Sequence, residues 1–327
     1  MKLGSLREGG RDGTLVVVSS DLSRAVRATA IAPTMQSAIE DWGRAAPALR
    51  DLSRALEAGS AAGAFALHAR DLASPLPRAF QWADGSSYLS HVELARRARG
   101  ADMPPSFLHD PLMYQGGSDR FLAPTDPIVA TREEWGIDFE AEVAIVVDDV
   151  PMGVDAGAAA GHVRLAMLAN DVSLRNLIPA EIAKGFGFFH GKPPTAFSPV
   201  AIDVEALGAA WDGRRLHGAI LSTLNGRRVG WPDAGVDMQF DFPSLVAHAA
   251  RTRPLAAGTI IGSGTVSNRD PARGWSCIAE IRAREMIAGG AAKTPFLRFG
   301  DRVRIEMLDA GGRTLFGAID QVVAQAR

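Results

Sequence analysis

Two glutamates lie two positions apart in a segment that alternates between apolar and polar residues. Over residues 137–145 apolar side chains fill the odd positions, while Glu140 and Glu142 occupy even ones. Because the side chains of a β-strand alternate between its faces, both carboxylates project from the same face, roughly 7 Å apart. A divalent cation such as Mg²⁺, Mn²⁺ or Ca²⁺ would relieve their repulsion through hard oxygen ligands. A strand with one solvated face would carry glutamates equally well, so the pair alone leaves both interpretations open.

Further titratable residues follow along the chain. Asp171 comes where an apolar run, which we expect to be an Ala-rich helix over 156–169, gives way to polar residues. Its carboxylate is either a metal ligand or the cap of a following helix. Arg175 would lie on the same helical face and could simply pair with Asp171. Lys192 lies among aromatic, Pro and Gly residues, which would either desolvate its amine or leave it extended at the surface.

The pattern of elements favours a strand-rich fold. Residues 1–75 predict a small N-terminal domain with strands over 14–19 and 25–31 and a helix over 35–57. After a Pro-bearing link, strands with Gly, Pro and Asp turns predominate over helices, which argues for a mixed-β core rather than a doubly wound parallel sheet. The expected strands are 141–147, 197–203, 219–224, 259–263, 276–283 and 302–307, with a closing hairpin across 309–313. The expected helices are 86–98, 156–169 and 242–251.

The composition excludes several classes of protein. The chain has 327 residues, 47% of them hydrophobic and 22% charged, and a net charge of −2, with neither a basic stripe for nucleic acid nor a polybasic run for a membrane surface. Its apolar runs are too short to span a bilayer and its start lacks a secretory signal, so we expect a cytoplasmic protein. The single cysteine, Cys277, excludes an intramolecular disulfide and a cysteine-based metal cluster. We expect its thiol to be a small buried hydrophobe in a strand.

Four short motifs occur in a fixed order and together resemble one family. They are Glu140-x-Glu142, Asn170-Asp171-x-Ser173-x-Arg175, Phe189-x-Gly191-Lys192 and Gly262-x-Gly264-Thr265-Val266-Ser267. Their order and spacing resemble the fumarylacetoacetate hydrolase (fumarylacetoacetase) superfamily over roughly residues 78–325, and the N-terminal unit is similar to that of bacterial fumarylacetoacetase-like proteins. The resemblance implies an α+β, strand-rich fold with a mixed β-roll catalytic domain over 76–327 and a small N-terminal α/β domain over 1–75. It also implies a homodimer.

The resemblance also assigns a metal site and a base. It implies that Glu140, Glu142 and Asp171 bind a divalent metal, Mg²⁺ first, with Ca²⁺ or Mn²⁺ as alternatives. Asp84 matches a fourth carboxylate upstream, although it could instead cap the helix that follows it. His91 matches the histidine that acts as base, with a surface helix histidine as the alternative. Glu280 matches the glutamate that orients this histidine, with an exposed strand glutamate as the alternative.

The remaining matches concern the substrate. Arg175 and Lys192 would steady a tetrahedral alkoxide, and Tyr114 and Thr265 would contact the substrate, although Tyr114 could equally belong to the core. One departure concerns Ile178, which stands where the family has a glutamine that helps hold the oxyanion. Losing one such donor can cost on the order of 10²-fold in rate.

The implied activity is hydrolysis of a carbon–carbon bond in a small 1,3-diketo acid such as fumarylacetoacetate, to fumarate and acetoacetate, in aromatic compound catabolism. Alternatives on the same metal site are an acylpyruvate hydrolase, an oxaloacetate decarboxylase, or a 2-hydroxydienoate hydratase or isomerase. A non-catalytic binding protein that retained the fold is an alternative of another class.

Overall fold

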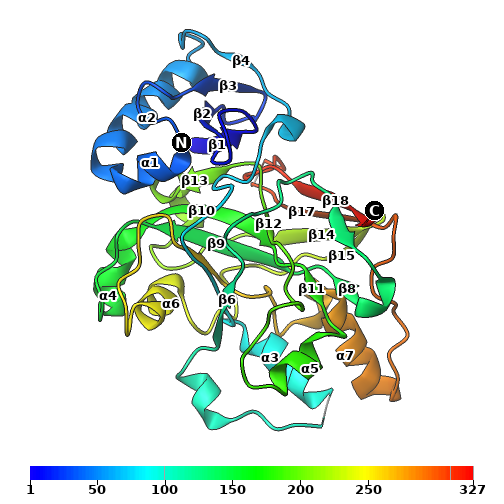
Figure 1. Ribbon diagram of the computed structural model, residues 1–327. Coiled ribbons are helices and arrows are strands. Elements are labelled where there is room, and N and C mark those ends of the chain that lie inside the picture. Colours follow the sequence, from blue (N-terminus) through cyan, green and yellow to red (C-terminus); the bar gives the residue numbers. More distant parts are fainter. Residues whose placement is uncertain (99, 310, 327) are drawn as a thin grey trace.

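The computed structural model describes residues 1–98, 100–309 and 311–326, and most of its strands belong to one large sheet (Figure 1). Within these residues the sheet has 11 strands in the order β4-β3-β2-β1-β13-β10-β9-β16-β5-β6, with β12 paired to β10. These strands are β1 (Lys2–Leu6), β2 (Thr14–Val18), β3 (Arg24–Arg27), β4 (Phe65–Ala66), β5 (Trp82–Gly85), β6 (Met113–Gly116), β9 (Ala141–Val147), β10 (Val163–Asn170), β12 (Ala196–Phe197), β13 (Ala201–Asp203) and β16 (Ile260–Gly262). Because β16 runs parallel to β5 and antiparallel to β9, the sheet is mixed, which confirms the predicted fold class.

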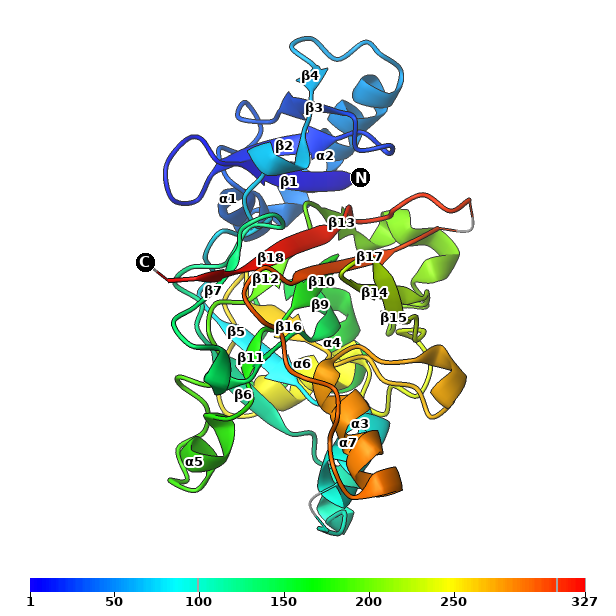
Figure 2. The same ribbon diagram turned by 90° about the vertical axis from the view of Figure 1, so that its right-hand side faces the viewer.

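A second sheet packs against the centre of the first. Its order is β15-β14-β17-β18-β7, and Figure 2 shows β17 and β18 in front of β9 and β10. Its strands are β7 (Ile128–Ala130), β14 (Ile220–Leu224), β15 (Arg227–Gly230), β17 (Arg302–Met307) and β18 (Ile319–Gln325), while β8 (Ile137–Asp138) and β11 (Ser173–Leu174) form a separate pair. Apolar side chains of both sheets, such as Val143, Leu168 and Ile305, share one core. The second sheet thus covers the face of β9 that carries Val143 and Ile145. The opposite face, which carries Glu142, Ala144 and Val146, is also buried, because it packs in a separate apolar core.

Helices cover the sheets and frame one end of the molecule. The α-helices are α1 (Met35–Glu40), α2 (Trp42–Glu57), α3 (Leu89–Arg97), α4 (Ala156–Ala159), α5 (Ile178–Ile182), α6 (Phe242–Ala249) and α7 (Ile278–Gly289). In Figure 1, α1 and α2 lie beside the N-terminal strands, and α3, α5 and α7 lie at the opposite end. Helix α3 packs against α7, whereas Figure 2 shows α5 apart from both. Over the described parts of the chain, no helix combines the length and apolarity that crossing a membrane would require.

The N-terminal strands extend the main sheet, because β1 pairs antiparallel with β13 and places Leu3 opposite Ala201. A second apolar core joins Leu3 and Val17 from this unit to Val146 and Met167 of the central strands. The sequence analysis did not foresee β1. The boundary at residues 75 and 76 stays a prediction, since backbone hydrogen bonds run continuously across the two units.

Two predicted elements are wrong, and both bear on the candidate site. The run over 156–169 is helical only in α4 and a short 3₁₀ turn, and then becomes β10. Its Ala, Leu and Met residues favour helix in isolation, but pairing with β9 and β13 buries both faces of a strand. The predicted strand over 276–283 is instead the start of α7, so Cys277 precedes a helix and Glu280 lies in its first turn.

Other predicted elements need smaller corrections. The strand over 25–31 ends at Arg27, the helix over 35–57 divides at Asp41 into α1 and α2, and the strand over 197–203 divides into β12 and β13. Strands corresponding to 141–147, 219–224, 259–263 and 302–307 are present, as are helices within 86–98 and 242–251. The closing hairpin joins β17 to β18, although Ala310 in its predicted turn lies outside the described residues.

Candidate metal and catalytic site

Neighbouring strands bring three acidic side chains together inside the molecule. Asp84 lies on β5, Glu142 near the start of β9, and Asp171 directly after β10, the antiparallel neighbour of β9. Each offers one carboxylate oxygen, and these three oxygens lie within 4.8 Å of one another. All three residues are buried. Neither Asp84 nor Asp171 caps a helix, since α3 begins after Tyr88 and β11 follows Asp171.

Two glycines of the motif at residues 262–265 shape the surroundings of Asp84. Gly262 lies opposite Asp84 in the sheet, and a Cβ at this position would lie 2.2 Å from Oδ1 of Asp84. Gly264 has φ +76°, a conformation that glycine adopts readily, and its N–H donates to the same Oδ1 at 3.0 Å. The motif therefore leaves room for the carboxylate of Asp84 and fixes its direction.

Glu142 is the acidic residue of this group that the protein stabilises least. Its side chain is fully buried, and neither carboxylate oxygen has a hydrogen-bond partner among the described residues. Burial and the nearby carboxylates of Asp84 and Asp171 raise the pKa of Glu142 well above its usual value. Burial and Asp171 raise the pKa of Asp84 in the same way. Burying a carboxylate without a hydrogen-bond partner or a counter-ion costs free energy. These carboxylates are therefore arranged as the ligands of a cation would be.

Glu140, predicted as a ligand together with Glu142 and Asp171, is held differently. Oε1 accepts from Arg175 Nη2 at 2.7 Å and from the hydroxyl of Thr265 at 2.6 Å, and Oε2 accepts from Lys192 Nζ at 2.5 Å and from the hydroxyl of Ser173 at 3.1 Å. Burial alone would raise the pKa of Glu140, but the charges of Arg175 and Lys192 outweigh it and hold that pKa well below its usual value. Glu140 is therefore ionised, and cations of the protein already neutralise it.

Lys192 connects Glu140 to the compact acidic group. Its ammonium donates to Asp171 Oδ2 at 2.6 Å as well as to Glu140, and its side chain is 9% exposed. Burial alone would lower the pKa of Lys192, but Asp171 and Glu140 reverse the shift and raise it. Lys192 is therefore a buried charged group, not the surface lysine of the alternative interpretation.

The set of donors fits a divalent cation. Among the described residues, Arg175 and Lys192 are the basic side chains that pair with the carboxylates of this site, and Arg175 is shared with Asp138. When all the carboxyl groups are ionised, their negative charge therefore exceeds the positive charge that the protein supplies. The three oxygens of the compact group are hard donors of the kind that Mg²⁺ and Mn²⁺ prefer. The unpartnered oxygens of Glu142 also supply lone pairs that the protein leaves unused. These residues could therefore hold such an ion.

A histidine–glutamate pair adjoins the acidic group. His91 on α3 places Nδ1 3.1 Å from Oε1 of Glu280, where α3 packs against α7. Glu280 is 2% exposed, so it is not the exposed strand glutamate of the alternative interpretation, while the His91 side chain is 18% exposed. Arg175 joins Glu140 to Asp138, and Asp138 accepts from the backbone of Ile278 at the start of α7. The His91–Glu280 pair therefore lies beside the acidic group.

Asp138 is a residue to which the sequence analysis gave no role. Its carboxylate accepts from the backbone N–H groups of Ile278 and Ala279 at 2.7 and 2.9 Å, and from Arg175 Nε at 2.9 Å. It therefore caps α7, which carries Glu280, and fixes Arg175. The signal was present, since Asp138 belongs to the same alternating segment as the two glutamates.

We expect Asp138→Asn to lower turnover while leaving metal binding intact, because the amide can no longer hold both Arg175 and the start of α7. The lost hydrogen bonds should reduce the free energy of unfolding by about 1–3 kcal/mol. The measurements are steady-state kinetics and thermal unfolding. Asp241→Asn is the matched control, since Asp241 caps α6 and pairs with Arg214. A similar loss of stability with unchanged kcat/KM in both variants would contradict a positioning role for Asp138.

The residues proposed to contact substrate line the same region. The hydroxyl of Tyr114 donates to Asp171 Oδ2 at 2.6 Å, and Lys192 Nζ lies 5.3 Å from the centre of its ring. Thr195, which the sequence analysis missed, donates to the other oxygen of Asp171 at 2.8 Å. Ile178 begins α5 and packs on Gly191, where a Cβ would lie 2.7 Å from its Cγ1. The departure at residue 178 thus places an apolar side chain beside the loop that carries Lys192.

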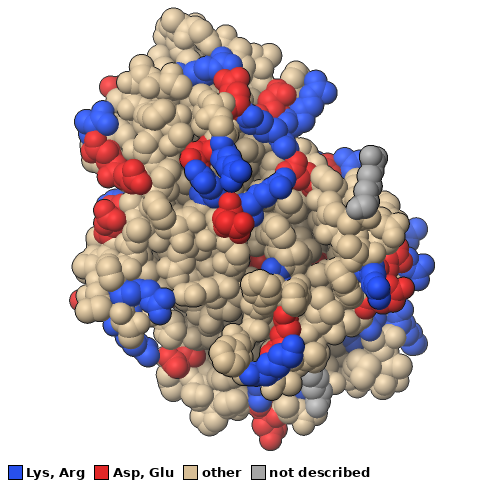
Figure 3. All heavy atoms as spheres, in the orientation of Figure 1, with Lys and Arg blue, Asp and Glu red and all other residues tan. Residues whose placement is uncertain are grey.

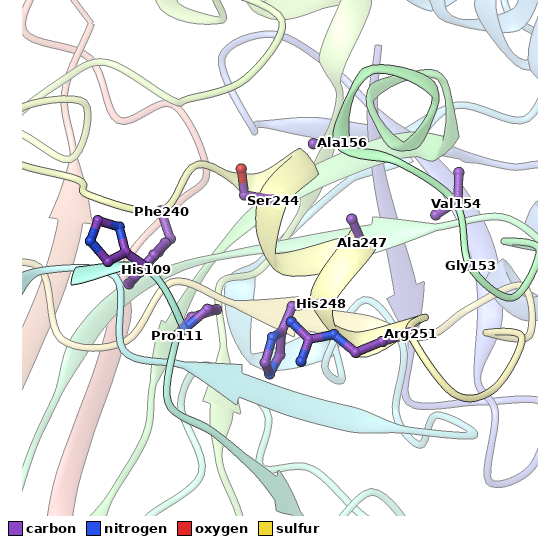
Figure 4. A pocket seen from close by; sticks show the side chains of 10 residues that line it. All are labelled: His109, Pro111, Gly153, Val154, Ala156, Phe240, Ser244, Ala247, His248 and Arg251. Atoms are coloured by element: carbon purple, nitrogen blue, oxygen red, sulfur yellow. The ribbon is translucent and has the colours of Figure 1, made fainter. Parts of the chain in front are cut away.

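A separate cavity of about 400 Å³ lies between α4, α6 and the segment before β6 (Figure 4). Its lining includes His109, His248 and Arg251 but none of the residues of the acidic group. Oδ1 of Asp110 lies 3.6 Å from Nδ1 of His248 and 3.4 Å from Nη2 of Arg251, so both basic side chains have an acidic neighbour. Elsewhere, basic and acidic side chains are interspersed over the face shown in Figure 3, in keeping with the small net charge.

Comparison with known proteins agrees with this arrangement of elements and motifs. Residues 81–324 match the family model described as Fumarylacetoacetate (FAA) hydrolase C-terminal. The chain belongs to the fumarylacetoacetate hydrolase family. Residues 1–78 match a second model, Fumarylacetoacetase N-terminal domain 2. The predicted superfamily is thereby confirmed.

Several members of the fumarylacetoacetate hydrolase family are similar to this chain. Oxaloacetate tautomerase YisK of Bacillus subtilis (strain 168) is 25% identical over 226 residues, which are 68% of this chain but only 64% of that protein. Fumarylacetoacetate hydrolase from Exiguobacterium antarcticum is 18% identical with a TM-score of 0.68, and both chains are covered completely. Maleylpyruvate hydrolase from Sphingobium sp. SYK-6, solved in complex with manganese(II) and pyruvate, is 18% identical with a TM-score of 0.65 and complete coverage of both chains. At these identities the two structures establish a common fold.

Proposed function

We propose that this protein is a metal-dependent hydrolase that cleaves a carbon–carbon bond in a small 1,3-diketo acid, such as fumarylacetoacetate or an acylpyruvate. The observation that carries the proposal is the pair His91–Glu280 next to a buried group of carboxylates that lacks enough positive charge. Family membership supports it, because related proteins named as hydrolases of fumarylacetoacetate and maleylpyruvate share the fold. A role in aromatic compound catabolism and a homodimeric state stay predictions.

Asp84, Glu142 and Asp171, together with Glu140, would hold the divalent cation. When bound, the cation supplies Lewis-acid stabilisation of the negative charge that develops on the substrate oxygens. We propose Mg²⁺ or Mn²⁺, supported by the hard oxygen donors of this chain and by the manganese(II) in the maleylpyruvate hydrolase complex.

His91 would act as general base. With Glu280 accepting a hydrogen bond from Nδ1, the neutral imidazole presents its lone pair at Nε2, where it can take a proton from water. The resulting hydroxide would attack the substrate ketone. The protonated imidazole is stabilised by Glu280, and it can return the proton to the carbon that departs.

Arg175 and Lys192 would bind the anionic oxygens of the substrate and of the tetrahedral alkoxide. The Lys192 side chain is 9% exposed and that of Arg175 is 18% exposed, and both side chains keep their charge. Burial would lower both pKa values, but Glu140 with Asp138 raises the pKa of Arg175, and Asp171 with Glu140 raises that of Lys192. Donors fixed in a buried site stabilise a developing charge more strongly than water does. The hydroxyl of Tyr114, which meets Asp171, lies at the same place and would contact the substrate.

A second candidate is proton transfer without bond cleavage, as in a tautomerase or isomerase. The observation that favours it is Ile178, which leaves one oxyanion donor fewer beside Lys192. The name of the relative from Bacillus subtilis, oxaloacetate tautomerase, agrees with this candidate.

The test is turnover of a panel of fumarylacetoacetate, acylpyruvates, oxaloacetate and 2-hydroxydienoates with Mn²⁺, with Mg²⁺ and with EDTA. We expect metal-dependent loss of diketone absorbance for one diketo acid, with two carboxylic products separable by chromatography. Enol–keto exchange of oxaloacetate without new products would establish the second candidate instead.

The same samples test for the metal without reference to the substrate. A cation at about 100 times its dissociation constant adds about 2.7 kcal/mol to the free energy of unfolding, which raises Tm by several degrees. An identical Tm in EDTA, Mg²⁺ and Mn²⁺ would contradict both the metal site and the enzyme.

A further inference from the structure

A second group of metal-ligating side chains lies next to the acidic one. Cys277, His91 and Glu280 each offer one ligand atom, and these atoms lie within 4.8 Å of one another. Cys277 immediately precedes α7, Glu280 lies in the first turn of α7, and His91 faces both from α3. The sequence analysis excluded a cluster of cysteines but did not consider a mixed set built around a single one.

One oxygen of this group has no partner. Oε1 of Glu280 meets His91, whereas Oε2 is buried and has no hydrogen-bond partner among the described residues. A buried carboxylate oxygen without a donor is uncommon and calls for an explanation. A cation shared by Oε2, the imidazole and the thiol would supply one.

The donors differ in kind from those of the acidic group. A sulfur, an imidazole nitrogen and a carboxylate oxygen are ligands that Zn²⁺ takes in proteins, whereas Mg²⁺ and Mn²⁺ prefer oxygens alone. Around a tetrahedral zinc ion such ligand atoms are roughly 3.3–3.8 Å apart. The three ligand atoms here lie within 4.8 Å of one another, so the most distant of them need to approach by only about 1 Å. With three protein ligands, the fourth coordination position of the ion would be free for water. Water can reach it past His91, whose side chain is partly exposed.

We propose that Cys277, His91 and Glu280 form a second metal site, which takes Zn²⁺ or a similar thiophilic cation and inhibits the enzyme when it is filled. Binding replaces the thiol proton, which is released to solvent, and engages the imidazole. Inhibition rests on the proposed function, because a histidine that binds zinc cannot accept a proton from water. Binding itself does not depend on that function.

The first test is a titration of the Mg²⁺-loaded protein with Co²⁺. Because Cys277 is the only cysteine of the chain, any thiolate-to-cobalt charge-transfer absorption must come from this site. We expect one equivalent of Co²⁺ to produce the band, Zn²⁺ to remove it, and excess Mg²⁺ to leave it unchanged. Cys277→Ala should show no band, and its Tm in Mg²⁺ reports whether it folds. Absence of the band in the wild-type protein would overturn the proposal whatever the substrate proves to be.

The second test measures inhibition by Zn²⁺ at a fixed excess of Mg²⁺. Cys277→Ser and Cys277→Ala keep the residues of the acidic group, so we expect them to retain basal turnover. Their sensitivity to Zn²⁺ should fall by at least about 10–100-fold, because removing even a group that only supports a metal ligand costs that much. Equal inhibition of wild type and both variants would mean that Zn²⁺ acts at the carboxylates instead, and would refute the inhibitory role of Cys277.

Discussion

Glu142→Gln is expected to abolish turnover and at the same time to make the metal-free protein more stable. The substitution removes a ligand whose two oxygens have no partner in the protein, so activity should fall roughly 10³-fold or more, since a metal ion contributes several kcal/mol. It also removes a buried negative charge near Asp84 and Asp171, and the new amide can donate to either. Burying an ion without a counter-ion costs several kcal/mol, so removing this charge should raise the free energy of unfolding of the metal-free protein.

The dependence of this effect on pH has a definite sign. Because burial and neighbouring carboxylates raise the pKa of Glu142 in the folded state, the folded protein holds this proton more tightly than the unfolded chain does. The contribution to stability is complete below the unfolded pKa of about 4.3 and is lost as the pH rises through the raised folded pKa. In EDTA the wild type should therefore lose stability relative to Glu142→Gln as the pH rises above about 4.3 and through the raised folded pKa. Adding Mn²⁺ should restore the stability of the wild type and leave that of Glu142→Gln unchanged.

Thermal unfolding in EDTA and in Mn²⁺ at several pH values measures this difference. Glu134→Gln, at an exposed position, is the control and should match the wild type throughout. If Glu142→Gln kept its turnover, or still gained stability from Mn²⁺ as the wild type does, the assignment of Glu142 as a ligand would be wrong.

His91→Ala should remove hydrolysis and preserve metal binding. General bases contribute about 10²–10⁴-fold to rate, and we expect a loss of kcat in that range. The rise in Tm caused by Mn²⁺ should remain, because His91 is paired with Glu280 and is not part of the compact acidic group. Steady-state kinetics and thermal unfolding of the same preparation measure both effects.

A matched control exists in His162, whose Nδ1 lies 2.7 Å from Oδ1 of Asp148 in another partly buried pair. His162→Ala should leave kcat unchanged. Loss of the Mn²⁺ effect in His91→Ala would show that the imidazole is a ligand rather than a base, and unchanged kcat would remove it from the mechanism.

Much of the candidate site could be predicted from the sequence, because its residues lie in short motifs whose order is distinctive. The alternation around Glu140 and Glu142 predicts a strand, and the glycines at 262 and 264 mark a close approach of backbone to Asp84. What the local pattern does not contain is the apolar core, shared with the N-terminal unit, that covers the face of β9 carrying Glu142. A strand with one solvent-exposed face and a strand buried on both faces can carry the same alternation. Only in the buried strand does an ionised acidic residue cost enough free energy to require a cation.

The errors have physical causes of two kinds. In β10 the Ala, Leu and Met residues have helical propensity, and pairing with two neighbouring strands overrides it. In α7 a helical signal was present, since residues 279–288 are rich in Ala, Arg, Glu and Met, but the apolar residues just before it suggested a strand. The cap that decides where α7 begins comes from Asp138, far away in the sequence, so no local window contains it.

The pairing of β1 with β13 also constrains the order in which the chain acquires its structure. During synthesis the residues of β1 emerge long before their partners around Ala201, which follow only after the intervening segment has been made. Until then β1 can pair on one side with β2, while its other edge stays open to non-native partners. Contacts between distant parts of a chain slow folding, because the intervening segment must be ordered first. Strand β1 thus completes its hydrogen bonds only after β13 has been made.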